Sequence, residues 1–120
     1  MDYFFDTYAI IEIIKENKEY EKYKEEIIVT SILNLGELYY SLLKQYGEEA
    51  ASSWYRKLEN TALPIDSDAV IDAMQFKFLH RKLSLSFIDC VGYILAKRHG
   101  LRFLTGDKAF KNIENVEFVD

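Results

Sequence analysis

The chain has 120 residues, of which 49% are hydrophobic, and its formal net charge is −5 at pH 7. Because domains typically have about 100–150 residues, we expect a single domain over residues 1–120, with enough apolar side chains to form a core. The negative charge excludes a protein that coats nucleic acid mainly by neutralising phosphates, since such proteins are usually basic.

The first elements follow from a change in hydrophobic period. Tyr3–Phe5 is a short apolar run that predicts a buried strand, and Asp6 follows it directly. From Thr7 the isoleucines recur at helical spacing, which predicts an amphipathic helix. The mixed-charge run 15–26 that comes next is typical of a solvated helical stretch.

The middle of the chain repeats this order. The β-branched run 27–30 predicts a second buried strand. Ser31 is suited to cap the next helix, and Gly47 is suited to end it. A third helix is expected over 48–60, and the run 62–65 predicts a short strand whose proline favours an edge position.

Two more helices and two more strands complete the pattern. Asp66 or Ser67 caps the first helix, and its acids up to Asp72 are expected to be capping and surface groups. Ser86 caps the second helix, which ends at Gly100. The remaining expected elements are strands over 101–104 and 116–119, a turn over 105–107 and one helical turn over 107–110.

Strands and helices therefore alternate along the chain. This alternation predicts an α/β fold with a short, mostly parallel central sheet of four to five strands and helices on both faces. In such sheets, binding sites lie outside the carboxyl ends of the strands. Polar side chains at those positions are the candidates for a functional site.

Four acidic residues, here called the acidic quartet, occupy such positions. Asp6 follows the first strand and Asp107 follows the fourth. Asp89 lies in the first turn of the helix that begins at Ser86, and Glu37 lies early in the helix that leaves the second strand. Because the carboxyl ends of parallel strands share one edge of a sheet, these four side chains can meet in one cleft.

Carboxylates that share a cleft raise one another's pKa, because ionising a second one costs Coulomb energy. A divalent cation removes this cost, and Mg²⁺ and Mn²⁺ prefer oxygen ligands. Two such ions about 3.5–4 Å apart can clamp the attacking and leaving oxygens of a phosphoryl displacement. An acidic protein can therefore act on nucleic acid through a bound metal.

Each acid also has a simpler explanation, which the sequence leaves open. Asp6 and Asp107 suit helix caps, and Ser86 with Asp89 resembles a capping box. Glu37 lies on a stripe of polar residues at helical spacing, which is typical of a solvated face. The other polar residues of this stripe are Asn34, Ser41 and Lys44.

Taken together, several stretches resemble the PIN domains and, within them, the VapC-type toxins of toxin–antitoxin pairs. The stretches are FFDTYAII, VTSILNLGELYY, LSFIDCVGYILAKRHG and RFLTGDKAF followed by VEFV. The resemblance covers essentially the whole chain and implies a PIN-like three-layer sandwich. It also implies that Asp6, Glu37, Asp89 and Asp107 match the family's acidic residues, which bind Mg²⁺ or Mn²⁺ for RNA cleavage.

Three further residues are candidates beside the quartet. Thr7 and Thr105 flank two of the acids, where their hydroxyls can orient water or a carboxylate, or serve only in a cap and a turn. Lys108 follows Asp107 and is the best candidate for a phosphate contact.

The resemblance implies a metal-dependent endoribonuclease that hydrolyses RNA phosphodiester bonds, forms a homodimer and is inhibited by a cognate antitoxin. A catalytically inactive PIN-like module that binds protein or RNA is the alternative. No run approaches the ~20 apolar residues that span a bilayer, so no membrane contact is expected. Cys90 is the only cysteine, which excludes an internal disulfide and fits the reducing cytoplasm where we expect the protein.

Overall fold

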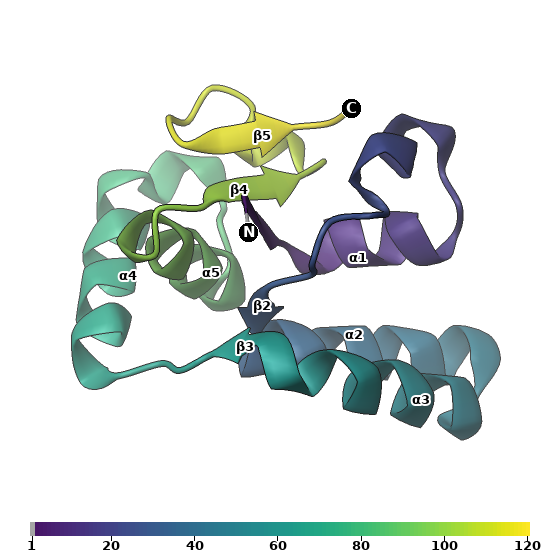
Figure 1. The fold of residues 1–120 in the computed structure, drawn as a ribbon. Helices are drawn as coiled ribbons and strands as arrows, with labels where there is room; N and C mark the ends of the chain where they lie inside the picture. The colour runs from purple at the N-terminus through teal and green to yellow at the C-terminus, as the bar shows by residue number, and fades with distance from the viewer. Residues whose placement is uncertain (1) are drawn as a thin grey trace.

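The computed structural model describes residues 2–120 and contains a parallel sheet. β1 pairs with β4 and β4 with β5, while β2 pairs with β3. A parallel bridge between Phe4 and Val29 joins the two groups, so the order across the sheet is β3-β2-β1-β4-β5 (Figure 1). The strands are β1 (Tyr3–Phe5), β2 (Thr30–Ser31), β3 (Ala62–Leu63), β4 (Arg102–Thr105) and β5 (Val116–Phe118).

Helices cover both faces of this sheet (Figure 1). The α-helices are α1 (Thr7–Ile14), α2 (Ile32–Tyr46), α3 (Glu48–Leu58), α4 (Ser67–Leu79) and α5 (Phe87–Arg98). The short 3₁₀ helices are η1 (Lys18–Tyr23), η2 (Glu59–Thr61), η3 (Arg81–Leu83) and η4 (Lys108–Phe110). Within residues 2–120, no helix combines the length and the apolar character that crossing a bilayer requires.

Two hydrophobic cores lie on opposite faces of the sheet because successive strand residues point in opposite directions. Phe4 and its register partner Phe103 pack with α4 and α5, whereas Phe5 and its partner Leu104 pack with α1, α2 and α3. The predicted α/β fold, a three-layer sandwich around a parallel central sheet, is thereby confirmed.

The charged run 15–26 is less solvated than the sequence suggests. Only η1 within it is helical, and Tyr20 and Tyr23 are buried in the core that contains α1 and α2. These tyrosines are three residues apart, which puts them on the same side of a 3₁₀ helix. The Tyr20 hydroxyl also donates a hydrogen bond to Val119 O (3.1 Å) and so ties this segment to the end of β5.

The second strand lies later than predicted. The run 27–30 is apolar, but Ile27 is exposed, and of this run Val29 forms the bridge to β1 while Thr30 begins β2. Ser31 ends β2 and also caps α2, where its hydroxyl accepts from Asn34 N–H (3.2 Å). The strand is short because the helix begins directly after it.

α5 lies directly against the sheet at Gly92. A Cβ atom placed there would be 2.9 Å from Phe4 Cε1 and 3.2 Å from Phe103 Cε1. The missing side chain therefore allows this close approach, which sets the position of α5 over β1 and β4. Asp89 lies one turn earlier on the same helix, so its position depends on this contact.

We predict that Gly92→Ala lowers the free energy of unfolding by about 1–3 kcal/mol, because the added methyl group overpacks the core. Gly36→Ala in α2 is the matched control, since nothing lies within 4 Å of a Cβ at Gly36. Alanine is favoured over glycine inside a helix by roughly 0.5–1 kcal/mol, so this variant should be slightly more stable. Urea unfolding measures both changes, and a Gly92→Ala protein as stable as the wild type would contradict the close approach.

Candidate functional site at the carboxyl ends of the strands

Asp6 lies where β1 ends, and only 3% of it is exposed. Its backbone N–H donates to Leu104 O of β4 (3.0 Å). Its Oδ1 accepts from Thr7 N–H (2.9 Å), so Asp6 is the N-cap of α1, as the simpler explanation predicts. Its Oδ2 accepts from the hydroxyl of Thr105, the last residue of β4 (2.7 Å). Both carboxylate oxygens are therefore held in place by neighbouring elements.

Thr105 links Asp6 to Asp107. Its buried hydroxyl donates to Asp6 Oδ2 and accepts from Asp107 N–H (3.0 Å). Asp107 is in turn the N-cap of η4, where its Oδ1 accepts from Ala109 N–H (3.0 Å). One hydroxyl thus fixes the turn that carries Asp107 relative to the carboxylate of Asp6.

Thr7 connects Glu37 to the surroundings of Asp6. Its Oγ1 donates to Glu37 Oε1 (2.7 Å) and accepts from Asn34 Nδ2 (3.1 Å). Asn34 is fully buried; its Oδ1 accepts from the Ser31 hydroxyl (2.6 Å), and its Nδ2 lies 3.5 Å from Asp6 Oδ1. The expectation that Asn34 belongs to a solvated stripe is therefore wrong. Its spacing of three from both Ser31 and Glu37 is the signal in the sequence that associates it with the site.

Asp89 lies in the first turn of α5 and completes a capping box. Its Oδ2 accepts from Ser86 N–H (3.1 Å), and its own N–H donates to Ser86 Oγ (3.1 Å). The predicted capping box is thereby confirmed. The cap does not isolate this carboxylate, because its charge acts on Asp6 and Glu37.

Burial and mutual repulsion raise the pKa values of three members of the acidic quartet. Burial raises the pKa of Asp6 to about 8, with further contributions from the charges of Asp89 and Glu37. Burial raises the pKa of Glu37 as well, and Asp89 adds to the rise. Burial again is the main cause of the raised pKa of Asp89, to which Asp107 contributes. Hydroxyl and backbone hydrogen bonds oppose each of these shifts, but the four charges remain coupled.

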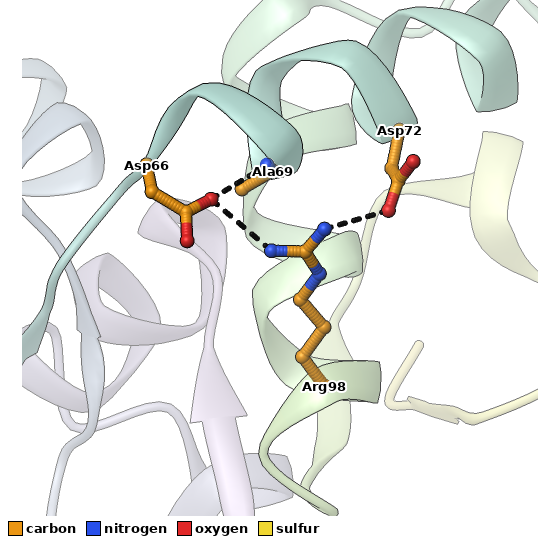
Figure 2. Close-up of polar contacts among 4 residues, drawn as sticks. All are labelled: Asp66, Ala69, Asp72 and Arg98. Atoms are coloured by element: carbon orange, nitrogen blue, oxygen red, sulfur yellow. Dashed lines mark hydrogen bonds and ion pairs between the residues drawn. The ribbon is translucent and has the colours of Figure 1, made fainter.

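Two acids outside the quartet, Asp66 and Asp72, are paired with an arginine. Arg98 of α5 lies 3.2 Å from Asp66 Oδ1 and 2.7 Å from Asp72 Oδ2, and so bridges two carboxylates at the start of α4 (Figure 2). The hydrogen bond from Ala69 N–H, followed by that from Arg98, lowers the pKa of Asp66. None of the ion pairs within residues 2–120 includes a member of the acidic quartet. Among the described residues, the ionised members of the quartet therefore have no ion-pair partner.

The donors of the quartet fit a hard divalent cation. All are carboxylate oxygens, which Mg²⁺ and Mn²⁺ prefer. In the part of the chain that the structure describes, no three Asp, Glu, His or Cys side chains are gathered tightly enough to form a ligand set on their own. This arrangement is compatible with Mg²⁺, which is usually held by one or two carboxylates and keeps several of its waters.

The three supporting candidates fall into two groups. Thr7 and Thr105 hold carboxylates of the quartet, which is one of the roles that the sequence leaves open for them. Lys108 is the first residue of η4 and is exposed directly after Asp107.

Comparisons with known proteins agree with this architecture. The family model for the PIN domain matches residues 3–116. The fold is similar to that of Mycobacterium tuberculosis VapC20, a sarcin-ricin loop cleaving toxin, with a TM-score of 0.82 and 18% identity over 99% of this chain and 100% of that chain. It is also similar to a chain of a toxin–antitoxin complex from Klebsiella pneumoniae, with a TM-score of 0.76 and 19% identity over 97% of this chain and 96% of that chain. No curated protein matches the chain.

The raised pKa of Asp6 predicts how stability depends on pH. Between about pH 4 and pH 8 the folded protein binds more protons than the unfolded chain, because Asp6 is protonated mainly in the folded state. Stability should therefore fall as pH rises through this window, by up to about 1.4 kcal/mol per pH unit from one such group. Urea unfolding in EDTA at constant ionic strength measures the slope.

Asp6→Asn should flatten this slope, because the variant has no proton to lose at that position. Asp66→Asn is the matched control and should keep it, since Asp66 has a lowered pKa and stays ionised throughout the window. A wild-type stability that rises or stays constant between about pH 5 and pH 8 would contradict the raised pKa of Asp6.

Proposed function

Because the chain belongs to the PIN domain family, we propose that it is a metal-dependent endoribonuclease that hydrolyses RNA phosphodiester bonds. One observation supports the proposal: near the carboxyl edge of the sheet, Asp6, Glu37 and Asp89 are partly or fully buried, and neighbouring acids of the quartet raise the pKa of each of them. The ion pairs within residues 2–120 leave this charge unbalanced. Acidic residues that are buried beside one another lower the stability of the fold at neutral pH. Their presence therefore favours a functional role.

The proposed ligands of Mg²⁺ or Mn²⁺ are Asp6, Glu37, Asp89 and Asp107. The bound ion would neutralise phosphate charge and lower the pKa of a water molecule so that it can act as nucleophile. The chain's own part is orientation: Thr105 and the N–H of α1 hold both oxygens of Asp6, and Thr7 holds Glu37. Fixed carboxylates reduce the entropy that is lost when the reacting groups are brought together.

RNA is the proposed substrate class. The description of VapC20 as a sarcin-ricin loop cleaving toxin supports it. Lys108 is the proposed phosphate contact, because it lies exposed directly after Asp107. A lysine at this position would act as a point charge on a phosphate oxygen.

We further propose that the protein works in the cytoplasm as a homodimer and is inhibited by an antitoxin protein. The similarity to a chain of a toxin–antitoxin complex supports a partner of that kind. α2 also presents exposed apolar side chains that a partner can cover. These are Ile32, Tyr40, Leu43 and Tyr46.

The alternative is a catalytically inactive PIN-like module that binds protein or RNA. Such a module gains nothing from coupled carboxylates that repel one another. A metal that binds the native state raises its stability, so thermal unfolding with and without Mn²⁺ tests the metal site independently of catalysis.

Asp6→Asn should lower Mn²⁺-dependent RNA cleavage by at least about 100-fold, because even residues that only support metal ligands cost 10–100-fold when changed. Asp66→Asn is the matched control: asparagine caps helices about as well as aspartate, so its activity should stay near that of the wild type. The measurement is the cleavage rate of single-stranded RNA by each protein, with Mn²⁺ and with EDTA.

Full activity of Asp6→Asn, or of the wild type in EDTA, would overturn the assignment of a metal-dependent site. Binding of Mn²⁺ and of RNA without any cleavage would favour the inactive binding module instead.

A further inference from the structure

Tyr8 is the second residue of α1, and 44% of it is exposed. Its neighbours Thr7 and Ala9 are buried, whereas Tyr8 is only partly covered. An exposed tyrosine is ordinary in itself. The position of Tyr8 in the chain is informative, because Asp6 and Thr7 of the candidate site directly precede it.

The ring of Tyr8 packs against the turn that carries Asp107. A Cβ atom placed at Gly106 would be 2.4 Å from Tyr8 Cε1 and 2.6 Å from the hydroxyl oxygen of Tyr20. The missing side chain at Gly106 therefore admits the edge of the Tyr8 ring. The hydroxyl of the buried Tyr20 donates to Val119 O, which holds this packing partner in place. One edge of the Tyr8 ring is thus fixed against the turn that carries Asp107, while 44% of the residue stays exposed.

An acidic protein benefits from a source of affinity for RNA that does not depend on its net charge. With a net charge of −5, little binding free energy can come from neutralising phosphates. Stacking of a base on an aromatic ring depends little on net charge and tolerates every base. A ring already held at one edge loses little conformational freedom when a base stacks on it.

We propose that Tyr8 stacks on a nucleobase of the bound strand, next to the phosphate that the acidic quartet engages. The inference rests on the proposed function, because it takes RNA to be the ligand of this site. Tyr8 is then a binding residue that adds affinity beside the metal ligands.

Two short fluorescein-labelled strands of equal length test this: an oligoadenylate and a ribose-phosphate chain without bases. Both carry the same charge, so their difference in affinity isolates the contribution of the bases. In an Asp6→Asn background, which avoids cleavage, we expect the oligoadenylate to bind roughly five- to hundredfold more tightly. Tyr8→Ala should remove most of this ratio by weakening only the oligoadenylate, whereas Tyr8→Phe should keep it. Fluorescence anisotropy measures each dissociation constant.

Tyr46→Ala is the matched control. Tyr46 is 56% exposed at the end of α2, about 14 Å along the helix from Glu37, so its removal should leave the ratio unchanged. Urea unfolding of each variant checks that the fold is kept.

Equal weakening of both strands by Tyr8→Ala would assign Tyr8 to packing against Gly106 only, and unchanged binding would assign the ring to another partner, such as a protein. Either result overturns the proposal, as does a wild-type protein without preference for the oligoadenylate. A preference that depends on Tyr8 in a protein that cleaves no RNA with Mn²⁺ would instead overturn the proposed function alone.

Discussion

The hydroxyl of Thr105 joins the ends of two neighbouring strands, and the site depends on that junction. It donates to Asp6 and accepts from the N–H of Asp107, so both acids keep their relation only while β1 and β4 keep their register. The register is in turn set by the cores. Phe4 and Phe103 pack on one face, and a shift by one residue would turn every strand side chain to the opposite face. The packing of the cores therefore also places the carboxylates.

Two groups of acids on the same molecule show how differently carboxylates can be used. Asp66 and Asp72 are exposed or half-buried, share Arg98 and fasten α4 to α5. Asp6 is buried among other acids, and its raised pKa means that ionising it in the folded state is unfavourable. If Asp6 had only a structural role, an ion-pair partner or a neutral side chain at this position would be more favourable. Sites that bind ligands commonly retain such unfavourable groups at a cost in stability.

The sequence predicts the parts of the fold and site that follow from local patterns. Asp6 stands directly after an apolar strand and Asp107 follows the fourth strand after the single residue Gly106, so the parallel-sheet rule brings them to one edge without knowledge of any contact. Asp6 can be both a helix cap and a site residue, because its two oxygens have different partners. Oδ1 accepts from Thr7 N–H in the cap, and Oδ2 accepts from the Thr105 hydroxyl. For Asp89 the capping box likewise coexists with its coupling to Asp6.

What the sequence does not predict depends on contacts between distant segments. Asn34 has the spacing of a solvated residue on α2, yet α1 covers it and Thr7 bonds to it. Tyr20 lies in a run of charges, and its burial follows from the approach of Val119 and Gly106, far away in the chain. The contacts that bury Asn34 and Tyr20 come from other segments of the chain, so the pattern within each stretch does not contain that information.

The charge of the site also constrains the order of binding in the proposed enzyme. A phosphate that enters beside the ionised carboxylates meets repulsion, which a divalent cation converts into attraction. Metal and RNA should therefore raise each other's affinity by the same factor, since coupling between two bound ligands is reciprocal. Stacking on Tyr8 involves no charge and contributes with or without the metal. The metal would then control where a phosphate engages, while the aromatic ring would retain the strand at an otherwise repulsive surface.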